Sequence, residues 1–261
     1  MAQIIHYFYT SHVGRCRKSN QDNFYCDGVF MPAENAGTEG VISGSVKPSD
    51  DPVFAVFDGM GGEEAGEMAA YLASREMDNF YFDSGTEQGF FQFCKNANGS
   101  ICDYTVANGI SSMGTTAAMM RFTKEESGLC NIGDSKIFLL SEGTLTQLSY
   151  DHVGIPVFGR KPPLTQNLGI PEDEMLIDPY VAMGSYNTGD VYLLCSDGLT
   201  DMVSVSRIEE ILNQYQGRAA AELLLEEALE NGGRDNVTFV LIYVNKKPNL
   251  FRRKKEVALW R

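Results

Sequence analysis

The sequence of 261 residues lacks the cysteine and histidine patterns that are typical of zinc sites and disulfide bonds. Its six cysteines show neither a C-x-x-C pair nor a spacing typical of paired cysteines, and Cys130 and Cys195 lie in apolar runs, where buried thiols are common. The histidines, His6, His12 and His152, are too scattered for a zinc site. We therefore expect a reduced, cytoplasmic protein without a zinc centre.

Long apolar segments are also missing. The longest runs, Val191–Cys195 and Val237–Val244, have the length of strands and are far too short to cross a bilayer. The first residues, Met1–Tyr7, show no basic segment followed by a long apolar one. We expect neither a membrane span nor a secretion signal.

An excess of positive charge is absent from most of the chain, whose formal net charge is -14. The exception is residues 246–261, which hold seven Lys or Arg and one Glu. The acidic body argues against nucleic acid as the main ligand. The basic tail can contact an acidic lipid surface or an acidic partner, although such tails are more often simply solvated.

The chain is organised around residues 53–62, Val-Phe-Ala-Val-Phe-Asp-Gly-Met-Gly-Gly. Five apolar residues in a row predict a strand that is buried on both faces, and a helical pattern begins near Gly62. Phosphate-binding loops have the same order of elements, but the spacings G-x-G-x-x-G and G-x-x-x-x-G-K-[ST] are both absent. Acidic residues after the glycines (Glu63, Glu64 and Glu67) would repel a pyrophosphate. This segment favours a cation.

Aspartates recur at such strand ends. Asp197 and Asp235 also lie where an apolar run meets a glycine-containing turn, and Asp22 and Asp134 lie at comparable turns. One Asp-Gly alone is usually a turn, but several indicate carboxylates that converge and need cations to ionise together. Donors that are all oxygen favour Mg²⁺ or Mn²⁺, and two such ions ~3.5–4 Å apart activate water for attack on phosphorus. Arg17, near Asp22, forms either a surface salt bridge or a clamp for an anion.

Five motifs, VFDGMGG, GTT, NIGDSK, SDGLTD and GRDN, resemble in order and spacing those of the metal-dependent Ser/Thr protein phosphatases of type 2C, in their bacterial form. The resemblance covers residues 1–244. It implies an α+β fold, a four-layer αββα sandwich of two packed antiparallel sheets flanked by helices, with the metal site at one end. We expect a single domain over residues 1–245, with a flap-like excursion over residues 153–188.

The resemblance also implies roles for individual residues. Asp58 would bridge two Mn²⁺ or Mg²⁺ ions, and the Gly59 carbonyl would bind the second of them. Asp197 and Asp235 would hold the first ion, and Arg17 would bind the substrate phosphate.

Further residues follow from the same resemblance. Asp22 would support the metal-bound waters, and Asp134, with Asp197 and Asp201, would form a weaker site for a third ion. The reaction implied is hydrolysis of phosphoserine and phosphothreonine in proteins by a hydroxide that bridges the metals, without a phosphoenzyme.

Three features depart from the family pattern. Gln21 stands where many relatives have Glu, which removes a negative charge near the second metal. Met60 replaces the histidine that animal members have after Asp-Gly, as is common in bacterial members. The flap is short, because Leu164–Gly169 resembles its end and few residues separate this segment from His152.

Two other functions stay open at this point. The short flap and Gln21 favour a pseudophosphatase that binds phosphoproteins without hydrolysing them, although the metal-ligand aspartates are all retained. The second of these functions is that of a structural metal-binding domain whose tail, residues 246–261, docks on a membrane. For the leading function, a phosphatase, we expect phosphoprotein substrates, an opposing Ser/Thr kinase and a monomeric protein.

Overall fold

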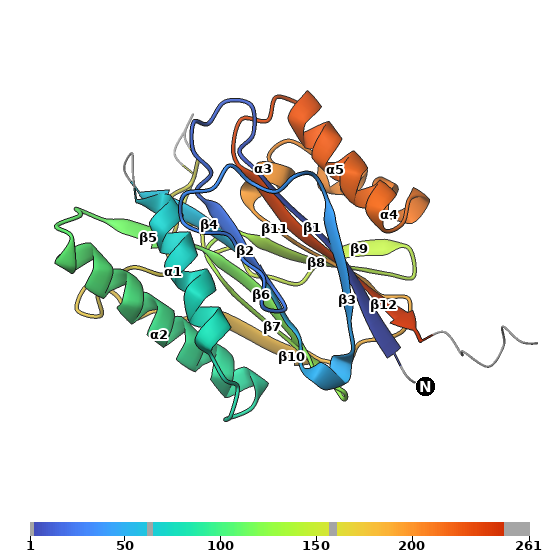
Figure 1. Cartoon of the computed structure of the whole chain (residues 1–261), viewed down its shortest axis with the longest axis horizontal. Coiled ribbons are helices and arrows are strands. Elements are labelled where there is room, and N and C mark those ends of the chain that lie inside the picture. The colour runs from blue at the N-terminus through green and yellow to red at the C-terminus, as the bar shows by residue number, and fades with distance from the viewer. Residues whose placement is uncertain (1–2, 62–64, 157–160, 248–261) are drawn as a thin grey trace, which may run out of the picture.

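The computed structural model describes residues 3–61, 65–156 and 161–247. Two antiparallel sheets pack face to face, with helices on both outer faces (Figure 1). This arrangement confirms the predicted four-layer α+β sandwich. Within the described residues, no helix combines the length and the apolar character that crossing a bilayer requires. Residues 248–261, which are most of the predicted basic tail, lie outside the described residues.

The first sheet has the strand order β3-β1-β12-β11-β8-β9. Its strands are β1 (Gln3–His12), β3 (Ile42–Val46), β8 (Lys136–Ser141), β9 (Thr144–Gln147), β11 (Val191–Cys195) and β12 (Val237–Lys246). The helices α3 (Asp197–Thr200), α4 (Val205–Gln214) and α5 (Arg218–Glu230) follow β11 in the chain. Apolar residues at helical spacing, Ile208, Ile211 and Leu212 in α4, form a core with Phe239 and Leu241 of β12.

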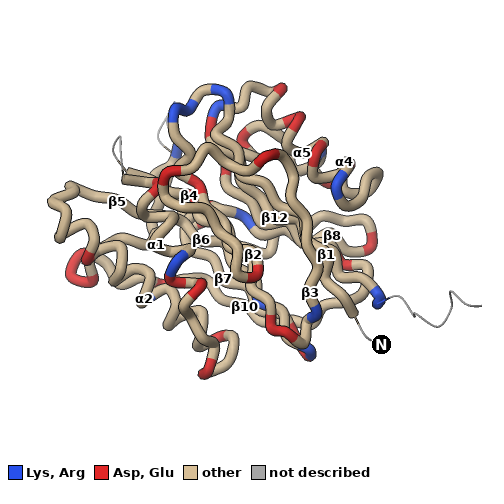
Figure 2. Tube along the Cα trace, in the orientation of Figure 1, with Lys and Arg blue, Asp and Glu red and all other residues tan. Residues whose placement is uncertain are grey.

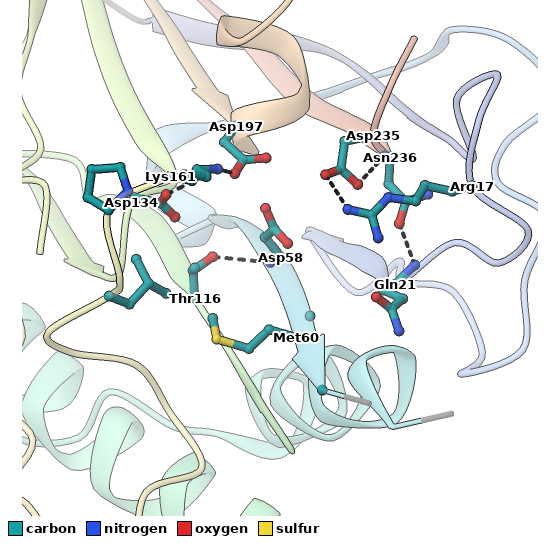
Figure 3. Close-up of a pocket in the computed structure, with 14 residues that line it drawn as sticks. Arg17, Gln21, Asp58, Met60, Thr116, Asp134, Lys161, Asp197, Asp235 and Asn236 are labelled. Atoms are coloured by element: carbon teal, nitrogen blue, oxygen red, sulfur yellow. Dashed lines mark hydrogen bonds and ion pairs between the residues drawn. The ribbon is translucent and has the colours of Figure 1, made fainter. Parts of the chain in front are cut away.

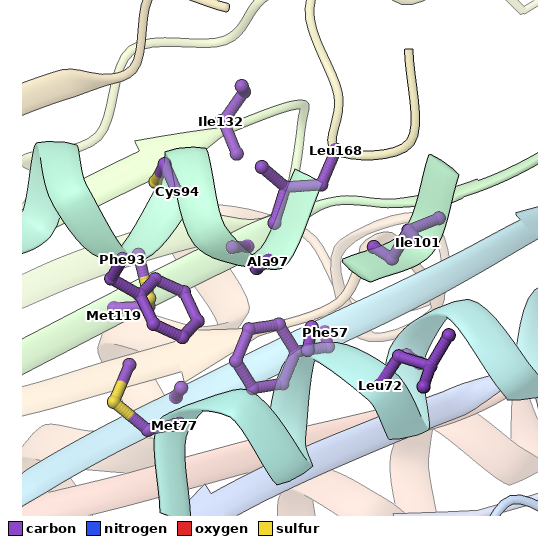
Figure 4. Packing of buried hydrophobic residues seen from close by; sticks show 14 of the residues in the cluster. Phe57, Leu72, Met77, Phe93, Cys94, Ala97, Ile101, Met119, Ile132 and Leu168 are labelled. Atoms are coloured by element: carbon purple, nitrogen blue, oxygen red, sulfur yellow. The ribbon is translucent and has the colours of Figure 1, made fainter. Parts of the chain in front are cut away.

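The second sheet has the strand order β10-β7-β6-β4-β2, and β5 pairs with the end of β4. Its strands are β2 (Asp22–Cys26), β4 (Val53–Gly61), β5 (Met113–Thr115), β6 (Ala117–Phe122), β7 (Ser127–Ile132) and β10 (Tyr180–Gly184). The helices α1 (Gly66–Asn79) and α2 (Thr86–Ala107) cover its outer face. Figure 4 shows this core, in which Phe57 packs with Leu72, Phe93 and Met119.

The apolar run of β4 is explained by its place between two cores. Ala55 and Phe57 face the helices α1 and α2, whereas Phe54 and Val56 pack between the two sheets. All four residues are fully buried. A strand that is covered on both faces has no solvent side, so its sequence shows no alternation of apolar and polar residues.

Two sequence interpretations need correction. Residues 32–52, a polar segment rich in Gly and Ser that the sequence alone indicates to be an exposed loop or a ragged hairpin, contain the edge strand β3, which pairs with β1. The excursion over residues 153–188 ends in the edge strand β10, which pairs with β7. Both strands are held by backbone hydrogen bonds at a sheet edge with little burial, so their side chains need not follow an apolar pattern.

Candidate active site

The strand ends bring the predicted aspartates to one end of the sandwich. Asp22 opens β2 and lies directly opposite Asp58 on β4. Asp197 is the first residue of α3, and Asp235 lies two residues before β12. Asp134 lies in the turn between β7 and β8. Segments that are far apart in the sequence thus supply one acidic site.

A cavity of about 320 Å³ lies at this end of the molecule (Figure 3). Its lining includes six of the predicted site residues, Arg17, Asp58, Gly59, Asp134, Asp197 and Asp235. The other two predicted residues do not line it. Asp22, opposite Asp58 on the neighbouring strand, is buried, with 2 % of its surface exposed, and Asp201 is exposed near Lys161 of the cavity lining.

Asp58 is held within a paired strand instead of in a free turn. The last three residues of β4 pair with β5, which opposes Gly59 to Thr115. Next to this pair, the Asp58 amide donates to Thr116 Oγ1 at 3.2 Å, and the Thr116 amide donates to the Asp58 carbonyl at 2.9 Å. A Cβ at Gly59 would lie 2.1 Å from the Gly66 carbonyl oxygen, so β4 can pass the start of α1 only with glycine here.

The buried carboxylates give the site an unbalanced negative charge. Burial raises the pKa of Asp58 well above its ordinary value, and the nearby Asp22, Asp134 and Asp235 raise it further. Burial also raises the pKa of Asp22 to about 7, although the Ser196 hydroxyl donates to Asp22 Oδ2 at 2.8 Å and opposes the shift. These carboxylates ionise readily only beside a cation.

Two basic side chains, Lys161 and Arg17, supply part of the positive charge that these carboxylates need. The Lys161 ammonium contacts the Asp197 carboxylate and lies 3.5 Å from Asp134 Oδ2 and 3.8 Å from Asp201 Oδ2. On the other side of the cavity, an Arg17 NH2 group lies 2.7 Å from Asp235 Oδ2 (Figure 3). Asp58 lies between these two ion pairs in the picture.

The donor set suits a hard divalent cation. Among the described residues that line the cavity, the side-chain donors include four carboxylates and there is no cysteine or histidine, which favours Mg²⁺ or Mn²⁺. In the part of the chain that is described, no three acidic, thiol or imidazole side chains are grouped as a finished metal site. Asp197 and Asp235 each form an ion pair with a basic side chain instead.

Asn236 holds the loop that presents Arg17. Its side-chain amide donates to the carbonyls of Val13 and Ser19 at 2.9 and 3.0 Å, and its Oδ1 accepts from the Gln21 amide at 2.8 Å. The loop between β1 and β2 is thereby tied to the start of β12. Gln21, which stands where many relatives have Glu, donates through Nε2 to Glu67 Oε2 at 3.3 Å.

The sequence prediction missed Lys161, Thr116 and Asn236. Asn236 and Thr116 belong to the motifs GRDN and GTT, so the motifs contained a signal for them. Lys161 had none, because it comes from the short flap, far in sequence from every carboxylate it approaches.

The family profile of protein phosphatase 2C matches residues 42–231 of the chain. The chain belongs to the protein phosphatase 2C family. The match spans β3 to α5 and so includes Asp58, Asp134 and Asp197, while Arg17 and Asp235 lie outside it.

Bacterial members of the family are similar over most of the chain. The serine/threonine phosphatase stp of Listeria welshimeri is 29% identical over 255 residues, which cover 89% of this chain and 93% of that protein. The serine/threonine protein phosphatase PstP of Mycobacterium tuberculosis is 33% identical over 204 residues, or 72% of this chain and 40% of PstP. The solved catalytic domain of PstP in complex with two manganese ions is 30% identical, with a TM-score of 0.73 over 94% of this chain and 100% of that domain.

Proposed function

We propose that this member of the family is a metal-dependent protein serine/threonine phosphatase, which hydrolyses phosphoserine and phosphothreonine in proteins. The observation that carries the proposal is the convergence of four aspartates and one arginine on a single cavity: Asp58, Asp134, Asp197, Asp235 and Arg17. A carboxylate cluster with an arginine at its rim can bind metal ions and a phosphate together. The family relatives and the manganese complex of PstP support the same function.

The residues that would hold two Mn²⁺ or Mg²⁺ ions are Asp58, the Gly59 carbonyl, Asp197 and Asp235. When bound, the ions would neutralise the carboxylates and the substrate phosphate and would activate water for attack on phosphorus. A weaker third site would use Asp134 and Asp201 together with Asp197. The proximity of all three carboxylates to the Lys161 ammonium supports this grouping.

Arg17 would bind the phosphate of the substrate. Its side chain is half exposed at the cavity rim, and among the described residues its only side-chain hydrogen bond goes to Asp235. A guanidinium has five N–H donors, so further donors can meet phosphate oxygens in a bidentate arrangement. Asp22 would act from the neighbouring strand β2, where its buried carboxylate adds to the negative potential at Asp58.

The proposal extends to the setting of the enzyme. We place it in the cytoplasm as a monomeric single domain over residues 1–245, acting on phosphoproteins that a Ser/Thr kinase modifies. The family membership and the compact sandwich over β1 to β12 support a single domain.

The test is hydrolysis of p-nitrophenyl phosphate and of a phosphothreonine peptide by the purified protein, titrated with Mn²⁺ and with Mg²⁺. Turnover is expected to require a metal, to stop in EDTA and to fall by at least about 10³-fold in Asp58→Asn, because metal activation of water supplies most of the catalysis. The matched control is Asp83→Asn, an exposed aspartate in the turn between α1 and α2, which should keep full activity. A folded wild-type protein without turnover at any metal concentration would favour the pseudophosphatase instead, and wild-type activity in Asp58→Asn would overturn the ligand assignment.

A further inference from the structure

A second cavity, of about 370 Å³, lies beside the acidic one. Its walls come from the end of α2, from β5 and the residues just before it, and from the segment that ends the flap. Apolar side chains line part of it, and Val106 on α2 is 81% exposed there. A large apolar side chain that is open to solvent beside a cavity offers a surface for another chain to cover.

The two cavities share a boundary. Met60 and Gly61, at the end of β4, line both of them. These residues pair with Gly114 and Met113 of β5, which line the second cavity. A polypeptide whose phosphorylated residue enters the acidic cavity can therefore place a neighbouring side chain in the second cavity by passing over Met60.

The far wall is fixed by hydrogen bonds. Thr115 and Leu168 exchange two backbone hydrogen bonds, of 3.0 and 2.9 Å. Asn98 of α2 accepts through Oδ1 from the amides of Gly169 and Ile170 at 2.7 and 3.1 Å, and its Nδ2 donates to the Ile170 carbonyl at 2.9 Å. The wall is thus built before any ligand arrives, which lowers the entropic cost of binding.

The charge of the second cavity is negative. Glu174 lines it, and no lysine or arginine is among its described lining residues. Acidic positions mark the loop beside the C-terminal part of α2 in Figure 2. Asp103, Glu174 and Glu172 all raise the pKa of the Cys102 thiol in the wall, in addition to its burial. Among the described residues, Glu174 forms no ion pair, so its charge is open to a ligand.

We propose that the second cavity binds a lysine or arginine side chain of the substrate, located next to the phosphorylated residue, with its charged end at Glu174. The aliphatic stem of such a side chain would lie on Met60, Val106 and Ile170. The inference rests on the proposed phosphatase function and names the class of protein substrate, which is one with a basic residue near the phosphoserine or phosphothreonine.

The experiment compares phosphothreonine peptides that carry Lys, Ala or Glu at one position at a time, from three residues before the phosphothreonine to three after it. The wild-type protein is expected to prefer Lys over Ala at one of these positions by about two- to fivefold in kcat/KM, the range for a partly exposed ion pair. Glu174→Gln should abolish this preference and Glu174→Lys should reverse it in favour of Glu. The matched control, Glu125→Gln, changes an exposed residue in the turn between β6 and β7 and should keep the wild-type preference.

Hydrolysis of p-nitrophenyl phosphate separates this inference from the proposed function. The small substrate does not reach the second cavity, so each Glu174 variant should hydrolyse it at the wild-type rate, which also shows that the variant is folded. A Lys preference that persists in Glu174→Gln, or the absence of any Lys preference in an active wild-type protein, overturns the inference and leaves the phosphatase function standing. Loss of p-nitrophenyl phosphate hydrolysis in the wild type refutes both.

Discussion

Lys161 forms ion pairs with carboxylates that we propose as metal ligands, so its removal should strengthen metal binding. The change that tests this is Lys161→Met, which keeps most of the length and loses the charge. In the structure the ammonium contacts Asp197 and lies within 4 Å of Asp134 and Asp201. A divalent cation bound to Asp197 would repel this ammonium, and wild-type protein must break the ion pairs before it binds the metal.

The size of the effect follows from the exposure of the partners. The Lys161 side chain is 51% exposed, whereas those of Asp197 and Asp134 are only 14% and 11% exposed. A single exposed ion pair contributes about 0.2–1 kcal/mol, so three contacts sum to roughly 0.6–3 kcal/mol, and we take about 1–2 kcal/mol from the middle of that range. That energy corresponds to a dissociation constant for Mn²⁺ about 5- to 30-fold lower in the variant.

Isothermal titration calorimetry with Mn²⁺ measures the dissociation constant directly, without reference to catalysis. Thermal unfolding gives a second measurement. In EDTA the variant should unfold at a lower temperature than the wild type, because its carboxylates have lost their partner, and Mn²⁺ should stabilise the variant more. The matched control is Lys95→Met, an exposed lysine on α2. Equal Mn²⁺ affinity in Lys161→Met and the wild type would refute the reasoning.

Two further predictions concern the loop and the turn that frame the site. Arg17→Ala should lower kcat/KM for phosphopeptides by about 10-fold or more, mainly through KM, since a charge-assisted hydrogen bond is worth about 1.5–3 kcal/mol. Arg17→Lys should restore part of the loss. Unchanged kinetics in Arg17→Ala would show that Arg17 does not bind the phosphate. His152, whose ring nitrogen bonds to Gly133 beside Asp134, has a pKa that burial lowers from 6.5. The unfolded chain therefore binds a proton that the folded protein resists, so the free energy of unfolding should fall as pH drops below about 6.5. Urea unfolding of wild type and His152→Asn at pH 7.5 and 5.5 measures this, and equal changes in both proteins would contradict it.

The positions of the aspartates could be predicted because each follows or opens an apolar run, and strand ends in a sandwich meet at a common end. Asp58, Asp197 and Asp235 line one cavity for this reason. Their roles as metal ligands stay predictions. The extension of β4 beyond Asp58 to Gly61 could not be foreseen, because it depends on pairing with β5, a strand of three residues that is distant in sequence.

Contacts between loops that are distant in the sequence could not be predicted from local sequence patterns. Lys161 contacts its carboxylates because the fold of the flap places it beside them. The second cavity is formed only where α2, β5 and the end of the flap lie next to one another. The edge strands β3 and β10 were missed because Gly, Ser and exposed residues there give little periodic signal. Sequence patterns indicate which residues are buried, whereas these features depend on backbone pairing between strands and on tertiary contacts between distant segments.

The central place of β12 between β1 and β11 has a consequence for synthesis of the protein. A ribosome releases Arg17 and Asp22 early, but the strand that follows Asp235 and completes the sheet emerges only after residue 236. Until then β1 and β11 each have an open edge, and Asn236 is not there to fasten the arginine loop. The nascent chain therefore cannot assemble the acidic cavity before residue 236 and the strand after it have been synthesised. Folding depends on contacts of very long sequence separation, which form slowly.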